Sequence, residues 1–277
     1  MGAGLRFTIL GCGSSGGVPR IGVDGPNWGA CDAADPRNRR RRCALLVERL
    51  SETARTALLI DAGPDIRHQL IEARCGLLDG VVLTHEHADH IHGLDDLRMV
   101  VFNRRALLPT FTDRLTAPTL RARFGYAFEA PPGSPYPPIL DLRLIDGPFE
   151  VAGPGGPISV TPFWVPHGEI QAMGLRVGPV AYTPDISGMT AEAWAAVDGA
   201  DCWITDALRY RAHLSHANVA TALDWIAEAK PRRALLTNLH VDLDYATLEA
   251  ETPPHVSPAH DGLVLEYPAD ATAERAV

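Results

Sequence analysis

The sequence predicts an α/β protein in which two β-sheets lie in layers with helices outside them. The chain has 277 residues and is 46% hydrophobic, which is enough for a full globular core. Short apolar runs of strand length recur in both halves and end at polar residues. In each half the strands predominate early and helical patterns follow. We expect residues 1–277 to form a single domain, with an insertion or lid at about residues 104–139.

The first half is predicted to contain strands and helices of ordinary length. The strands are expected at residues 7–10, 43–50, 56–60 and 80–83, and the helices at residues 66–73 and 91–101. Residues 104–139 contain several prolines, including a run at 131–138, and we interpret them as irregular.

The second half repeats the same style of strand and turn. Its strands are expected at residues 142–145, 158–163, 174–177, 180–182, 202–205 and 234–237, and its helices at residues 191–197 and 218–228.

The densest chemical pattern follows the strand at residues 80–83. The next seven residues read Thr-His-Glu-His-Ala-Asp-His, the pattern H-x-H-x-D-H. His85 and His87 point the same way in an extended segment and can bind one ion. Asp89 and His90 follow the strand end and face a second ion position roughly 3.5–4 Å away. Such ligands suit zinc, manganese or iron, and their number predicts two ions and hydrolytic chemistry. The alternative is a surface histidine cluster without a ligand role.

Further candidate ligands follow predicted strands of the second half. His167 follows the apolar run Phe-Trp-Val-Pro, Asp185 follows the strand at 180–182, and His240 follows the strand at 234–237. Scaffolds commonly place active sites just past strand ends, although a single histidine there is more often structural. We therefore count these residues as ligands because they complete the dense cluster.

The glycine-rich run at residues 11–19 superficially resembles a phosphate loop. It lacks the Lys-Ser/Thr ending of a P-loop, and no clear helix follows it. We interpret it as a backbone turn that passes close to the metal site.

Charge and cysteine content exclude several classes of protein. The net charge of −9 argues against a general nucleic-acid binder, although residues 37–42 are locally basic and form either a solvated loop or an anion-binding patch. The five cysteines form no C-x-x-C pair and are odd in number, so we expect no disulfide framework, no cysteine zinc site and a reducing cytoplasm. The N-terminal residues do not form a signal peptide, and no apolar run approaches the roughly 18 residues of a membrane span.

With these residues in order, the chain resembles the metallo-β-lactamase superfamily over residues 5–267. The positions that carry the resemblance are Asp61 after its strand, the H-x-H-x-D-H motif, His167, Asp185 and His240. The resemblance implies a four-layer αββα sandwich, of class α/β (α+β), with a dimetal site at one edge of two packed sheets. It also implies the ligands: one ion held by His85, His87 and His167, the other by Asp89, His90 and His240, and Asp185 bridging them.

Within the superfamily the chain is similar to the PhnP-like branch, the phosphoribosyl cyclic phosphodiesterases. The shared features are the glycine-rich start ending in Gly-Val-Pro, the arginine-rich stretch before Cys43, and Gly-Leu-x-x-Leu-Arg at residues 93–98. His216 corresponds to a histidine near the scissile phosphate in that branch.

Two departures indicate a relative of that branch rather than its type member. The branch carries a structural zinc held by clustered cysteines, whereas only Cys31 stands in that region here. The family often has Leu-Thr-His at the last ligand, whereas this chain has Leu-Thr-Asn ending at Asn238, with His240 two positions later. We expect His240 to be the ligand, since imidazole binds better and a loop can adjust. Asn238 as a weak oxygen ligand, or an open coordination position, is the alternative.

The resemblance implies metal-assisted hydrolysis of a small phosphodiester or cyclic phosphate, with two divalent cations, zinc or manganese, as cofactors. Asp185, His216 and Asp89 are the expected catalytic residues. Asp185 would bridge the metals and help to orient the attacking water. His216 would protonate the leaving alkoxide or bind a phosphate oxygen, with His213 as the substitute. The alternative for both histidines is an exposed structural role.

Arginines are expected to contact the part of the substrate that does not react. Arg98 and the stretch Arg39–Arg42, Arg42 included, would bind a non-reacting phosphate. Asp61 would orient a ligand histidine without binding metal itself.

Three alternatives remain from the sequence. A tRNA 3′-processing ribonuclease shares the motifs but needs a basic protruding arm, and a thioesterase or lactonase of the same fold would use the same metals. A metal-dependent nucleotide-binding protein without turnover belongs to a different class. We expect a small phosphorylated substrate, such as a nucleotide-like molecule, no membrane, no stable nucleic-acid partner, and a homodimer, which is common in the family.

Overall fold

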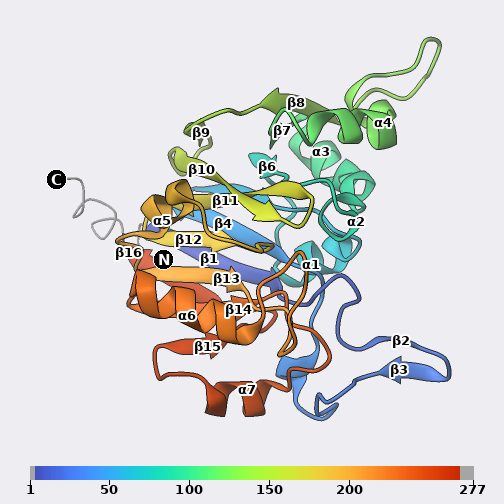
Figure 1. The fold of residues 1–277 in the computed structure, drawn as a ribbon. Coiled ribbons are helices and arrows are strands. Elements are labelled where there is room, and N and C mark those ends of the chain that lie inside the picture. Colours follow the sequence, from blue (N-terminus) through green and yellow to red (C-terminus); the bar gives the residue numbers. More distant parts are fainter. Residues whose placement is uncertain (1–3, 269–277) are drawn as a thin grey trace. The chain divides into compact units, whose positions relative to one another are not determined.

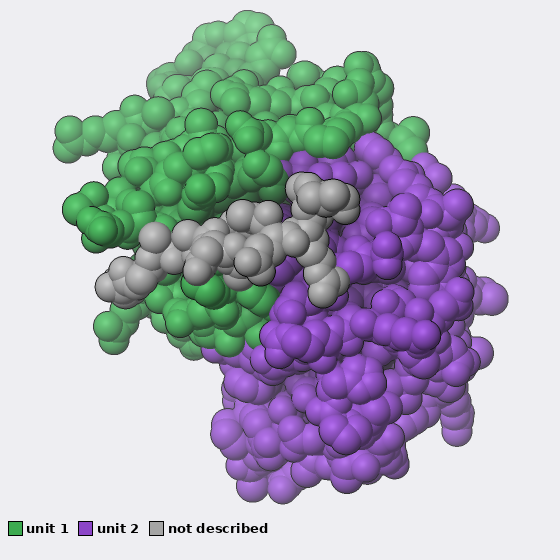
Figure 2. All heavy atoms as spheres, turned by 90° about the vertical axis from the view of Figure 1, so that its left-hand side faces the viewer, with its two compact units in different colours: residues 1–10, 44–159, 264–269 green, residues 11–43, 160–263, 270–277 purple. Residues whose placement is uncertain are grey.

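A computed structural model describes residues 4–268 (Figure 1). The described chain divides into two compact units, which Figure 2 shows in separate colours. Unit 1 comprises residues 4–10, 44–159 and 264–268, and unit 2 comprises residues 11–43 and 160–263. Each unit contains a β-sheet and several helices, and each holds one group of the predicted site residues.

The sheet of unit 1 has the strand order β16-β1-β4-β5-β6-β7-β8. Its strands are β1 (Gly4–Gly11), β4 (Ala44–Leu50), β5 (Arg55–Ile60), β6 (Gly80–Val82), β7 (Leu108–Thr112), β8 (Leu140–Leu144) and β16 (Val264–Pro268). Pairing is antiparallel between β16 and β1 and between β4 and β5, and it is parallel from β5 to β8. Because Ile60 pairs with Val82, the loops after β5 and β6 leave the sheet at the same edge.

Helices of unit 1 pack on this sheet through an apolar core. They are α1 (Ile66–Glu72), α2 (Ala88–Ile91), the 3-10 helix η2 (Leu94–Leu97), α3 (Arg98–Arg104) and α4 (Ala117–Phe128). Core residues come from strands and helices alike, as Leu59, Val81, Ile91 and Leu120 show, since all four are fully buried. The short strand β9 (Phe149–Val151) also belongs to this unit.

The helix expected at residues 91–101 is instead divided into three pieces, and the division has a steric cause. Gly93 lies directly after α2 and donates its N–H to the carbonyl of Ala62 at 2.8 Å. A Cβ atom at this position would lie 2.0 Å from the carbonyl oxygen of Gly63. The close approach of these two loops therefore interrupts the helix and fixes the metal-motif segment against the loop after β5.

Residues 108–112 and 117–128 are regular, so the expectation of irregular structure was wrong there, whereas the proline run at residues 131–138 is irregular as expected. The regular ranges are β7, an interior strand of the sheet, and α4. Pro109 lies inside β7, but its ladder with β6 involves Thr110 and Phe111, which follow the proline. Pro118 lies in the first turn of α4, where a missing N–H is tolerated. Prolines that we read as breaks thus stand at positions that strands and helices accept.

The sheet of unit 2 has the strand order β15-β14-β13-β12-β11-β10-β9, and its last strand, β9, falls in the residue range of unit 1. Its strands are β10 (Ile158–His167), β11 (Ile170–Val177), β12 (Val180–Thr183), β13 (Cys202–Asp206), β14 (Arg233–Thr237) and β15 (Val256–Pro258). Pairing is antiparallel from β10 to β12 and parallel from β12 to β15. Thr183 pairs with Thr205 and Asp206 pairs with Thr237, so the carboxyl ends of β12, β13 and β14 meet at one edge.

Helices, a hairpin and the glycine-rich turn complete unit 2. These elements are α5 (Ala191–Val197), α6 (Val219–Ala229), α7 (Tyr245–Glu251), the hairpin strands β2 (Arg20–Gly22) and β3 (Gly25–Asn27), and the 3-10 helix η1 (Pro36–Asn38). The core includes Phe163, Trp203, Ala222 and Leu236, all at most 1% exposed. Among residues 4–268, no helix is long and apolar enough to cross a membrane.

Candidate metal centre

The metal motif of unit 1 begins where β6 ends. Two backbone hydrogen bonds connect its loop with the loop after β5: Asp61 N–H donates to Val82 at 2.8 Å, and Ala62 N–H donates to His90 at 2.7 Å. His87 caps the first turn of α2, and the N–H of His90 donates to its carbonyl at 3.0 Å. The backbone of the motif is therefore fixed before any side chain is considered.

Asp61 orients the histidines of this motif from a buried position. It is fully buried with a φ of 64°, and it accepts hydrogen bonds from Thr84 N at 2.8 Å and from Thr84 Oγ1 at 2.9 and 3.0 Å. His90 Nδ1 lies 2.7 Å from the same carboxylate. Burial raises the pKa of Asp61, whereas the adjacent His90 lowers it. With Nδ1–H donated to Asp61, the Nε2 atom of His90 is the ring atom that can bind a metal.

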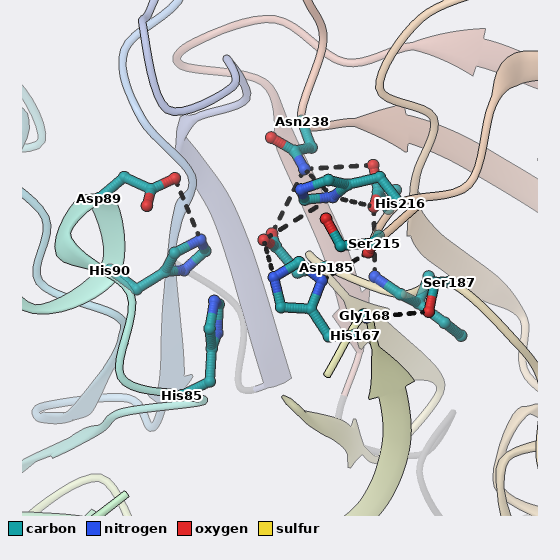
Figure 3. Close-up of polar contacts among 12 residues, drawn as sticks. His85, Asp89, His90, His167, Gly168, Asp185, Ser187, Ser215, His216 and Asn238 are labelled. Carbon is teal, nitrogen blue, oxygen red and sulfur yellow. Dashed lines mark hydrogen bonds and ion pairs between the residues drawn. The ribbon is translucent and has the colours of Figure 1, made fainter. Parts of the chain in front are cut away.

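The other members of the motif surround His90. The ring centroid of His85 lies 4.7 Å from that of His87 and 4.2 Å from that of His90. Asp89 Oδ2 lies 3.6 Å from His90 Nε2 (Figure 3). His85 and His90 are buried and His87 is exposed. Unit 1 thus brings together four of the predicted ligands, His85, His87, Asp89 and His90, which we call the unit 1 donor set.

In unit 2, His167 is the last residue of β10 and Asp185 follows β12, which β11 separates from β10 in the sheet, and the two side chains face one another (Figure 3). His167 Nε2 lies 3.4 Å from Asp185 Oδ2, and both residues are almost fully buried. Two ligands of one tetrahedral zinc ion lie about 3.3 Å apart, so this spacing suits a shared ion. His167 Nδ1 lies 2.6 Å from the carbonyl oxygen of Ser215, so Nε2 is the ring atom that faces Asp185. We call this pair the unit 2 donor set.

Asp206 is the residue of this site that the sequence reasoning missed. It is fully buried at the end of β13, and its Oδ2 lies 2.7 Å from His216 Nδ1. Burial raises the pKa of Asp206 to about 7, against the lowering effect of His216. Asp206 ends the apolar strand β13, and Asp185 lies two residues after β12, so the strand-end rule could have found Asp206 as well. The carboxylate directs Nε2 of His216 away from β13, and the His216 and His167 rings are 4.6 Å apart.

Asn238, rather than His240, lies beside Asp185 and His216 in the structure. The amide nitrogen of Asn238 lies 3.4 Å from Asp185 Oδ1 and 3.1 Å from His216 Nδ1. His240 contacts Asp242, with Nδ1 3.1 Å from its carboxylate, and its backbone accepts from Arg40 at 3.4 Å. Burial lowers the pKa of His240.

Hydrogen bonds of the backbone hold this arrangement in register. Leu239 donates its N–H to the carbonyl of Cys12 at 2.8 Å and accepts from the N–H of Ser14 at 3.3 Å. On the other side, the N–H of His240 donates to the carbonyl of Leu208 at 3.0 Å, and the carbonyl of Thr237 accepts from Ala207 at 3.0 Å. Each such bond contributes about 1 kcal/mol, so a two-residue shift that moved His240 to the place of Asn238 would cost several of them. The glycine-rich turn thereby packs against the strand end next to Asn238.

The predicted substrate-binding residues are placed less tightly. Arg98 begins α3 and donates to Asp95 at 2.8 Å. His213 is exposed, its Nδ1 accepts from Ser215, and its ring lies 5.1 Å from that of His216. Burial and the neighbouring His216 lower the pKa of His213.

The arginine-rich stretch serves mainly to hold unit 2 together. Arg40 is buried and donates to Asn38 at 2.9 Å, and Arg37 donates to Asp35 at 2.8 Å. Arg42 is half-buried and lies near Gly17 of the glycine-rich turn.

The chemistry of both donor sets fits a divalent cation. Each set combines imidazole and carboxylate groups, which are the usual ligands of zinc and manganese. In each set a histidine has its other ring nitrogen bonded to a carboxylate or carbonyl oxygen, an arrangement that is typical of metal ligands.

Comparison with known proteins decides the family. A sequence model described as "Beta-lactamase superfamily domain" matches residues 56–238, more than half of the chain. The chain belongs to the metallo-β-lactamase superfamily. The fold class is therefore confirmed, and so is the expectation of a hydrolase.

Solved structures assign the chain to a branch of the superfamily. The crystal structure of a diphosphatase from the PhnP family is 30% identical, with a TM-score of 0.84, and the match covers 96% of this chain and 98% of that one. This superfamily member therefore lies in the PhnP-like branch. The fold protein YhfI from Bacillus subtilis (20% identity, TM-score 0.70, 96% and 100% covered) and human tRNase Z, short form (19%, 0.62, 95% and 99%), share the fold.

A curated relative introduces a second chemistry. A protein of Porphyromonas gingivalis (strain ATCC BAA-308 / W83) named octanoyltransferase is 34% identical over 266 residues. The match covers 94% of this chain but 51% of that protein, so the chain spans about half the length of this relative.

Proposed function

We propose that the chain is a dinuclear metal-dependent hydrolase that acts on a small phosphodiester or cyclic phosphate. The observation that supports this most is the pair of buried Asp206 and half-buried His216 beside the unit 2 donor set. It provides a proton-carrying imidazole next to two metal-binding side chains. The likeness to a PhnP-family diphosphatase over almost the whole chain supports the same class of substrate.

We propose the assignment of ligands that the resemblance to the superfamily implies. In this assignment His85, His87 and His167 would hold one cation, Asp89 and His90 would hold the other, and Asp185 would contribute its carboxylate to them. When bound, zinc or manganese would lower the pKa of a water molecule and offset negative charge on the phosphoryl oxygens. Nothing in the donor chemistry separates zinc from manganese.

The chain's own residues would then orient the substrate and the attacking water and transfer protons. Asp206 holds Nδ1–H of His216, so Nε2 is presented to the substrate, where it donates a proton to the leaving alkoxide or binds a phosphate oxygen. Asp185 orients the attacking water, assisted by Asp89. His213, Arg98 and Arg42 would bind the part of the substrate that does not react.

A second candidate is hydrolysis of an acyl substrate, such as a thioester or lactone. The octanoyltransferase name of the half-matched relative favours it, and the same metal site could attack a carbonyl carbon. Ribonuclease activity of the tRNase Z type is a weaker candidate, because those structures are below 20% identical and share only the fold. A nucleotide-binding protein without turnover is the remaining alternative.

We also propose a cellular compartment, a substrate class and an oligomeric state for the enzyme. We propose a reducing cytoplasm, since all five cysteines are free and buried. The substrate would be a small phosphorylated molecule, including nucleotide-like ones, and the enzyme a homodimer, which size-exclusion chromatography with light scattering can test.

The test is a substrate screen on protein reconstituted separately with zinc and with manganese. Cyclic phosphates, bis-p-nitrophenyl phosphate, lactones and thioesters are compared for the wild-type chain, His87→Ala and His216→Ala. We expect phosphodiester turnover that both substitutions abolish or reduce at least about a hundredfold. Turnover confined to lactones or thioesters would support the second candidate, and binding of nucleotides without any turnover would support the last.

A further inference from the structure

Asn238 stands between two buried carboxylates of unit 2. Its amide nitrogen lies 3.4 Å from Asp185 Oδ1 (Figure 3) and 3.2 Å from Asp206 Oδ1. Asn238 and Asp185 are each 2% exposed, and Asp206 is fully buried. Two carboxylates that close to one amide repel each other unless a donor lies between them, and water does not reach this position freely.

The surroundings decide which end of the amide faces the carboxylates. With its nitrogen there, Asn238 donates one hydrogen to each of two acceptors. With its oxygen there, Asn238 would face two carboxylate oxygens, and the nearby Nδ1–H of His216, 3.1 Å from this atom of Asn238, is directed to Asp206 Oδ2 at 2.7 Å. The hydrogen-bond pattern therefore selects the nitrogen.

The backbone keeps the side chain in this place. Asn238 has a φ of 60°, a left-handed conformation that asparagine adopts more readily than most residues. The residues on both sides of it are bonded to the segments at residues 12–14 and 207–208. The amide can therefore neither withdraw nor exchange places with His240.

We infer that Asn238 is a positioning residue and not a metal ligand: its amide holds Asp185 Oδ1, which leaves Oδ2 facing His167 Nε2 for the ion. The inference rests on the proposed function only in that His167 and Asp185 are taken to bind metal. It implies that the strand end after β14 supplies no ligand at all. The two proposed ions then differ in affinity, because the one held by Asp89 and His90 has fewer protein ligands.

Two substitutions distinguish a residue that positions Asp185 from a residue that binds metal. Only the positioning role affects the protein when metal is absent. Asn238→Asp keeps the shape but replaces the donor with a third carboxylate. We expect its chelator-treated form to melt well below the chelator-treated wild type at pH 8. If Asn238 were an oxygen ligand without a donor role, the two metal-free proteins would melt alike, and that result would overturn the inference.

Asn238→Ala provides a second test that survives if Asn238→Asp does not fold. Metal equivalents are counted by mass spectrometry after reconstitution, and affinity is measured by competition with a chromogenic chelator. We expect the same number of equivalents as in the wild type, with the tighter ion bound about tenfold more weakly, as when other partners of a metal ligand are removed. Loss of a whole equivalent with the remaining affinity unchanged would show that Asn238 is a ligand.

These measurements do not depend on turnover. If the wild-type protein bound metal but hydrolysed no phosphodiester, the proposed function would fail while the melting and stoichiometry results kept their meaning. Asn103→Ala serves as the control, because Asn103 is an exposed residue of α3 whose amide donates to the Gly76 carbonyl. It should match the wild type in metal content and affinity.

Discussion

At the scale of single residues, Asp61 shows how one buried carboxylate can organise a metal site without binding metal. It receives both hydrogen-bonding groups of Thr84 and the Nδ1 of His90. We expect Asp61→Asn to weaken metal binding by about 10- to 100-fold, because the ring of His90 loses its fixed tautomer and orientation. Chelator competition measures this affinity. Asp95→Asn, which removes an exposed partner of Arg98, should leave it unchanged.

Asp261 of unit 2 gives a prediction about pH. Its carboxylate accepts from Arg41 N at 2.9 Å and from Cys12 N at 3.2 Å, and burial raises its pKa from 3.8 to about 7. The protonated form is thus favoured in the folded state. The stability that this proton contributes is fully present below about pH 4 and is lost as the pH rises through about 7.

The measurement is the urea midpoint of metal-free protein between pH 5 and pH 8. We expect the midpoint to fall with rising pH in the wild type and to fall less steeply in Asp261→Asn, which cannot titrate there. Identical slopes for the two proteins would contradict the assigned pKa of Asp261.

At the scale of elements, α4 is connected directly to the metal motif of unit 1. Thr119 donates to the carboxylate of Glu86, and Arg123 donates to its carbonyl at 2.8 Å. Phe124, where the helix is kinked, places its ring 5.6 Å from that of His92. Since Glu86 lies between His85 and His87, α4 restrains the segment that presents both ligands.

This contact predicts a difference between two arginines of one helix. Arg123→Ala should weaken metal binding by roughly fivefold, the effect of losing one hydrogen bond. Arg121→Ala removes the same charge from an exposed position of the same helix and should have no effect. Equal effects of both substitutions would mean that charge, rather than the bond to Glu86, is responsible.

The metal motif, β7 and α4 show where prediction from the sequence succeeds and where it fails. The rings of His85, His87 and His90 lie together as the H-x-H-x-D-H motif predicted, because residues so close in the sequence need only local geometry to meet. Asp61 was also expected to orient a ligand histidine, and it contacts His90. In contrast, β7 and α4 were hidden by prolines whose positions are harmless only in the context of the sheet and the helix start. Asp206 was overlooked, and the register that places Asn238 beside Asp185 depends on backbone bonds to residues 12–14, more than 200 positions away in the sequence.

At the scale of the whole molecule, bound metal should stabilise the fold, since both units contribute donors. Metal at a hundred times its dissociation constant adds about 2.7 kcal/mol to the free energy of unfolding. For a chain of this size we expect chelation to lower the melting temperature by roughly 5–10 °C. Differential scanning calorimetry with and without chelator measures the shift. In His87→Ala the shift should be smaller, and an equal shift would mean that the ions bind elsewhere.

The most direct test of the central claim compares two substrates on one metal-loaded preparation. The ratio of kcat/KM for bis-p-nitrophenyl phosphate to that for an octanoyl thioester distinguishes a phosphodiesterase from an acyl hydrolase. We predict a ratio of at least about 100, which falls steeply in His216→Ala because the leaving alkoxide loses its proton donor. Efficient thioester hydrolysis without phosphodiester turnover would contradict the account.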